Sequence, residues 1–248
     1  MKRLILIIII LFASFSVSSE TRTSPKTINQ VIDHFQGLVQ TYSKQKNYRL
    51  VFAKIYLETT LMIQQEIAKN EYRYPEWVEE AVVEFSKYYL RAIKGDLDGG
   101  PVAPAWKKCF EFNDKKYHKL SVQLLLAMNA HISNDLAFAL SKTFDDGWDT
   151  IRVEKDYFKM MEMFETAIPK FIIHLRQMEK TLGIRKKGLK EYAILKIVSS
   201  MRENAWENAL ELHFASPWRR EHLTKEIQLN ALDLAEWIIS GRFFIPAN

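Results

Sequence analysis

The chain has 248 residues, of which 48% are hydrophobic, so it can bury a large core. It carries 35 basic against 30 acidic residues, interspersed and not clustered in one stripe, which gives no reason to expect a nucleic-acid partner. Cys109 is its one cysteine, which excludes a fold held by internal disulfides.

The first nineteen residues have the order of a secretory signal peptide. Lys2 and Arg3 precede an unbroken apolar run from Leu4 to Ala13, and small residues rich in serine follow up to position 19. The run of about ten residues is shorter than the roughly twenty that span a bilayer. We therefore expect residues 1–19 to be removed and an exported, periplasmic or secreted protein without a stable membrane span to remain. A retained N-terminal anchor is the alternative.

The rest of the chain, residues 20–248, is expected to be a single all-α domain. Losing Lys2 and Arg3 but no acid lowers the net charge from +5 to +3. Only 8 Gly and 7 Pro occur, no segment shows sustained period-2 alternation, and no linker rich in Pro, Gly or Ser divides the chain. We predict a helical bundle of seven or eight helices.

Local signals place these helices along the chain. Ser24 and Pro25 are expected to open the first one, and Pro169 to kink the long one that follows Tyr157. Between Gly95 and Pro104 lies the loop GDLDGGPVAP, which we interpret as a turn. It is not interpreted as a calcium-binding loop, because a loop of that type starting at Asp96 needs glutamate at its twelfth position, where Lys107 stands. The expected helices cover about 25–46, 48–70, 75–95, a short segment from Trp106, 120–140, 157–182, 189–214 and 217–240.

The segment 120–140 is apolar around nearly its whole circumference, so we expect it to be the buried central helix. Its middle nevertheless carries polar side chains, namely Asn129, His131, Ser133, Asn134 and Asp135. His131 and Asp135 lie about 40° apart on one helix face. Burying an ionisable pair without partners costs several kcal/mol, so polar groups, water, a ligand or a metal must meet them.

The i to i+4 spacing of His131 and Asp135 allows two interpretations. It suits a shared metal ion, or a carboxylate that fixes the histidine tautomer for general-base catalysis. It equally suits a structural pair that hydrogen-bonds between helices and fixes their register. The sequence leaves both open.

Three further polar residues, Glu58, Asp156 and Arg202, are expected to converge on this pair. Glu58 lies on an apolar helix face and needs donors, and Arg202 can donate to a carboxylate while Trp206 stacks on its guanidinium plane. We therefore expect His131, Asp135 and Arg202 as candidate catalytic residues. One divalent metal such as zinc is a candidate cofactor, with ligands from His131, Asp135, Glu58 and Asp156, and with His34 as a further candidate.

Several segments together resemble the bacterial domain-of-unknown-function 5995 family, with the NAHIxxDL element as the most specific part. The resemblance covers most of residues 20–248 and implies a helical single domain without a known activity. It marks Asn129, His131, Asp135, Asp156, Arg202 and Trp206, and Glu58 lies within a similar segment. The segments are AKIYLETT (53–60), YPEWVEEAVVEFSKYYLRAI (74–93), PVAPAW (101–106), LLLAMNAHISNDLAFAL (124–140) and RENAWENAL (202–210).

The HxxxD element is also similar to one part of the zinc-dependent phospholipase C and P1 nuclease group. That group implies an exported, all-helical phosphodiesterase with a metal cluster. The chain departs from it, because the first histidine after Asp135 is His174 and no Trp stands at the expected mature N-terminus. A trinuclear cluster is therefore not expected, and a mononuclear site stays open.

Two functions of different class follow. The first is an exported hydrolase of a phosphodiester or other ester, with a small-molecule or lipid substrate, centred on His131 and Asp135. The second is a non-catalytic binding or structural protein whose buried polar network only stabilises the fold. The chain has no Gly-rich phosphate loop and no GxSxG motif, and Cys109 has no histidine near it on its own helix.

Overall fold

The computed structural model describes residues 24–113, 120–181 and 191–240, all of whose regular elements are helices. Counting the unbroken series α5, η2 and α6 as one, this part of the chain has eight helices and no strand, which confirms the all-α prediction. The bounds are α1 (Ile28–Lys44), α2 (Leu50–Ala68), α3 (Pro75–Asp98), α4 (Pro104–Asn113), α5 (Leu120–Met128), η2 (Asn129–Leu136), α6 (Ala137–Asp145), α7 (Thr150–Thr181), α8 (Glu191–Phe214) and α9 (Pro217–Ser240). The expected signal peptide lies outside the described residues, as does the expected break between the helices 157–182 and 189–214.

Several helix ends differ from the sequence prediction: α7 begins at Thr150 and not at 157, and α6 carries the central helix to Asp145 and not to 140. Two other differences have a visible cause. Helix α1 begins at Ile28, because Thr27 and not Ser24 caps it: the Thr27 hydroxyl accepts from the Gln30 backbone N–H at 3.3 Å. Helix α3 continues past Gly95 to Asp98 and ends at Gly99, whose φ of 70° is left-handed. A side chain at Gly95 would meet the Pro101 carbonyl oxygen at 2.6 Å, so this glycine allows a close backbone approach and not a helix end.

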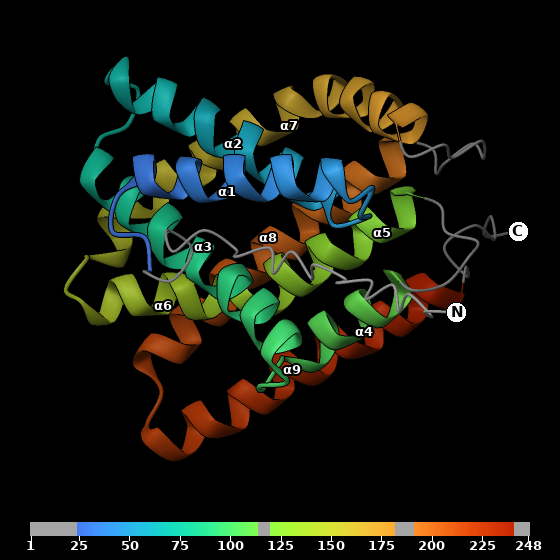
Figure 1. The fold of residues 1–248 in the computed structure, drawn as a ribbon. Helices are drawn as coiled ribbons and strands as arrows, with labels where there is room; N and C mark the ends of the chain where they lie inside the picture. Colours follow the sequence, from blue (N-terminus) through green and yellow to red (C-terminus); the bar gives the residue numbers. More distant parts are fainter. Residues whose placement is uncertain (1–23, 114–119, 182–190, 241–248) are drawn as a thin grey trace, which may run out of the picture.

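The continuous series α5–η2–α6 forms the centre of the bundle, as predicted. Every residue of α5 is buried, as are seven of the eight residues of η2. Helices α3, α4, α8 and α9 all pack against η2. In Figure 1, α1, α2 and α7 lie on one side of this central helix, and α4 and α9 lie on the other.

The middle of the central helix is not an ordinary α-helix. Residues Asn129–Leu136 form a π-helix, whose wider turn changes which side chains face each neighbouring helix. Asn129 uses this position to donate from Nδ2 to the backbone oxygen of Ala231 in α9, at 2.7 Å. The π segment therefore carries the polar residues that the sequence had placed on a regular helix.

Pro169 lies inside α7, which is continuous from Thr150 to Thr181. Among the described helices, none combines the length and the apolar character that crossing a bilayer requires.

Candidate functional site

The buried centre is organised around the carboxylate of Asp135, which accepts from three N–H donors. Trp106 Nε1 of α4 donates to Oδ2 at 2.7 Å, and His131 Nδ1 lies 3.0 Å from the same oxygen. Asn134 Nδ2 donates to Oδ1 at 2.7 Å. Asp135 and His131 are each 2% exposed, so bulk solvent is almost excluded from them. The pair that the sequence predicted does meet, and the hydrogen bond from Trp106 to Asp135 ties α4 to η2.

The contact with Asp135 selects the tautomer of His131. Because a carboxylate only accepts hydrogen bonds, Nδ1 carries the proton and Nε2 carries the lone pair. Burial lowers the pKa of His131; Asp135 opposes this shift, and the positive charge of Arg202 adds to it. The ring is therefore neutral near pH 7. Its Nε2 is buried and has no hydrogen-bond partner.

Aromatic rings enclose His131. Phe85 of α3 stacks on the imidazole, with ring centroids 3.5 Å apart and planes 11° from parallel. Phe52 and Tyr56 of α2 meet it edge-on, at centroid distances of 5.3 and 5.2 Å. These rings come from two helices and close the imidazole off from solvent, which accounts for the lowered pKa.

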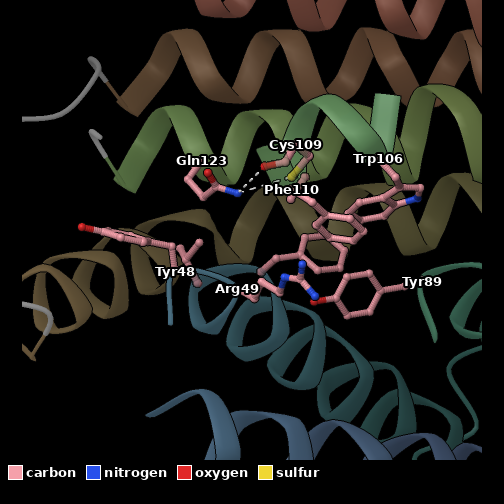
Figure 2. A pocket seen from close by; sticks show the side chains of 10 residues that line it. Tyr48, Arg49, Tyr89, Trp106, Cys109, Phe110 and Gln123 are labelled. Carbon is pink, nitrogen blue, oxygen red and sulfur yellow. Dashed lines mark hydrogen bonds between the residues drawn. The ribbon is translucent and has the colours of Figure 1, made fainter. Parts of the chain in front are cut away.

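A small cavity lies beside this aromatic wall without reaching the polar pair. Phe52, Tyr89 and Trp106 line it, together with residues that include Arg49 and Cys109, whereas neither His131 nor Asp135 does. Its volume is about 10 Å³, enough for one water molecule. Figure 2 shows that the indole nitrogen of Trp106 points away from the other residues of this pocket. The cavity is therefore no substrate cleft onto Asp135.

Cys109, on the wall of this cavity, is a packed free thiol. Gln123 Nε2 lies 3.3 Å from its sulfur and 3.2 Å from its backbone oxygen. Burial raises the pKa of Cys109 to about 12, so the thiol stays protonated at neutral pH and is a poor nucleophile.

Glu58 and Asp156 do not join the pair, contrary to the expected convergence. Glu58 is buried between α2 and α7, where it pairs with His174 Nδ1 and, at 3.1 Å, with Lys54 Nζ. Asp156 accepts from the backbone N–H groups of residues 73 and 74, at 3.0 and 2.6 Å, and so holds the segment that leads into α3. Each carboxylate is therefore satisfied by donors away from the His131–Asp135 pair.

The described residues therefore offer no metal centre of the predicted kind. No group of three or more His, Cys, Asp or Glu side chains in this part of the chain is placed to hold a metal ion, and this covers Glu58, Asp156 and His34. At Asp135 a metal would have to displace the donors that already occupy both oxygens. The donor set of His131 and Asp135 does not fit zinc as it stands.

Arg202 lies on α8, half-buried, and its contacts differ from the prediction. Its guanidinium stacks on Phe164 of α7, with Cζ 3.8 Å from the ring centroid. Trp206 instead stacks on Tyr157, at 4.7 Å between centroids. The Tyr157 hydroxyl donates to the backbone oxygen of Arg202 at 2.6 Å. Burial lowers the pKa of Arg202 to about 10, yet the side chain remains a cation at neutral pH.

Sequence reasoning did not identify Trp106 as a partner of Asp135. Trp106 stands in the PVAPAW segment, 29 positions before Asp135, and no spacing rule connects two helices across that separation. The sequence showed that the carboxylate of Asp135 needs a donor, but it did not show which residue supplies that donor.

A family model described as "Family of unknown function (DUF5995)" matches residues 28–241. The chain belongs to this family. The match spans the series of helices from α1 to α9, and hence all the residues of the buried centre described above. No curated protein and no solved structure matches the chain. Membership in the DUF5995 family therefore assigns no reaction to the site.

Proposed function

We propose that this protein is an exported, non-catalytic helical binding protein whose buried His131–Asp135 centre stabilises the fold. One observation supports the non-catalytic role: the Asp135 carboxylate accepts three hydrogen bonds from the chain's own donors at 2% exposure. An ionised carboxylate has about four lone-pair sites, so little capacity is left for a metal or a reacting water. Function then lies in contacts made by the protein's surface.

Such a centre favours one arrangement of the packed helices over the others. Transferring a carboxylate from water into a protein interior costs several kcal/mol, and well-placed donors offset that cost. Because Trp106 reaches Asp135 only when α4 lies in one register against η2, every other register leaves a buried charge short of a donor. The centre thereby selects one arrangement of the bundle.

A second candidate function, hydrolysis of a phosphodiester or other ester, is favoured by one observation. His131 has its Nδ1 held by a carboxylate and its Nε2 lone pair without a partner, which is the arrangement of a general base. For this function the Phe85 ring, which lies on the imidazole, must move to admit a substrate. A small ester or a lipid is the substrate class that this reading implies.

Metal analysis and esterase assays on the same preparation separate the two candidates. The protein is purified without chelator or metal-affinity resin, and it is assayed against phosphodiester and carboxylic ester substrates beside His131→Gln. The non-catalytic proposal expects no stoichiometric transition metal and equal background rates for both proteins. Activity that His131→Gln abolishes while remaining folded contradicts it and supports the hydrolase.

Export is tested separately. Mass analysis of protein recovered from its native host is expected to give an N-terminus near Glu20. Membrane-bound protein that retains Met1 contradicts export with cleavage and favours the anchor.

A further inference from the structure

One cation beside the buried centre has no counter-ion among the residues that the structure describes. The guanidinium of Arg202 makes no hydrogen bond or ion pair with any described residue, and its Nε is buried without a partner. The other half-buried arginines of the described chain are paired: Arg49 with Asp96, Arg219 with Glu211 and Glu226, and Arg220 with Asp145. Arg202 is thus the exception among the half-buried arginines of the described residues.

The surroundings of Arg202 hold its charge in place without neutralising it. The face of the guanidinium lies on Phe164, which supplies a cation–π contact, and its N–H groups are left without an acceptor among the described residues. Burial lowers the pKa of Arg202 and the carboxylate of Glu165 opposes this shift, but the Glu165 side chain is exposed and accepts from Ser199 Oγ. His131, on the side of the buried centre, is neutral.

A half-buried cation without a partner is costly, since it loses part of its hydration and gains no hydrogen bonds in return. A guanidinium whose face is packed and whose N–H groups lack an acceptor is suited to a forked pair of hydrogen bonds to an oxyanion. We propose that Arg202 binds the carboxylate or phosphate group of a small soluble ligand where α7 and α8 pack together. This rests on the proposed binding function and names the class of its ligand.

The test is thermal unfolding of the full chain in inorganic phosphate and, separately, in acetate, each against chloride at matched ionic strength. Arg202→Gln removes the charge, and Arg219→Gln is the matched control because Arg219 is half-buried and already paired. At about 100 times Kd, the wild type and the control should gain roughly 5 to 10 °C in Tm, and Arg202→Gln should gain none. Which of the two anions acts tells a phosphate ligand from a carboxylate ligand.

The proposal is overturned if neither anion stabilises the wild type, or if Arg202→Gln gains as much as the wild type. Should Arg202→Gln fail to fold, the Nε–H resonance of Arg202 in the wild type is followed during titration with phosphate and with acetate. A saturable shift supports the site, and no shift overturns it. The proposed non-catalytic role is unaffected by either result, because metal content and esterase rates test it.

Discussion

Replacing Asp135 tests the buried centre most informatively when two variants are compared. In Asp135→Ala, the N–H groups of Trp106, His131 and Asn134 all lose their acceptor. A buried donor left unpaired costs about 1–3 kcal/mol, and three such donors, all of them neutral, remain in this variant. We expect Asp135→Ala to lose about 3–5 kcal/mol of unfolding free energy.

Asp135→Asn should cost less, for a reason visible at Asn134. The new amide oxygen can take the place of Oδ2 and accept from Trp106 and His131. The new NH₂ group then faces Asn134, whose own Oδ1 is buried without a partner and can accept after the Asn134 amide flips. What is lost is the charge assistance of these bonds, so we expect about 1–3 kcal/mol.

Urea or thermal unfolding followed by circular dichroism measures both losses. For a chain of this size, about 1 kcal/mol shifts Tm by roughly 2–4 °C, so Asp135→Ala should melt roughly 6–20 °C below the wild type. Asp146→Asn is the control: Asp146 is an exposed residue that pairs with Lys142, and its replacement should cost no more than about 0.5 kcal/mol. Equal losses below about 1 kcal/mol for both Asp135 variants would refute the account of a charge solvated by three donors.

Three further predictions concern other features. Gly95→Ala should destabilise the protein by about 1–3 kcal/mol, because the added Cβ meets the Pro101 oxygen. Gly37→Ala, in open space within α1, should stabilise it by about 0.5–1 kcal/mol. Equal effects of the two variants in urea unfolding would contradict the close approach at Gly95. Because burial lowers the pKa of His131, this histidine binds a proton more readily in the unfolded chain, so the free energy of unfolding should fall as the pH drops below about 6.5. The difference in unfolding free energy between wild type and His131→Gln, measured in urea from pH 7.5 to 5, should therefore shrink. A constant difference would contradict this. Cys109 should react with a thiol reagent only at the rate of unfolding, and rapid labelling of the native protein would show that the thiol is accessible.

The sequence predicted well what depends on neighbouring positions in the chain. The helical class, the central position of 120–140 and the meeting of His131 with Asp135 all follow from periodicity and from the i to i+4 geometry. The choice of cap at α1 was wrong by three residues, because Ser24 and Thr27 are both competent caps and only the folded chain selects one.

Partners across helices could not be predicted in this way. Arg202 was assigned to Trp206 because both lie on α8, yet Phe164 of α7 takes the guanidinium and Tyr157 takes the indole. Glu58 was assigned to the buried centre, yet it pairs with His174, 116 positions away. A polar residue on an apolar face shows that some partner is required, but the partner's identity depends on how helices pack.

The central claim, that the centre around Asp135 is sealed and structural, is tested most directly by hydrogen exchange of the Trp106 indole Nε1–H. This proton is buried and bonded to Asp135, so a sealed centre predicts that it exchanges only when the whole protein unfolds. Its opening free energy, measured by NMR under native conditions, should equal the global free energy of unfolding. An opening free energy several kcal/mol below the global value would contradict the claim, because it would show that solvent reaches Asp135 in the folded protein.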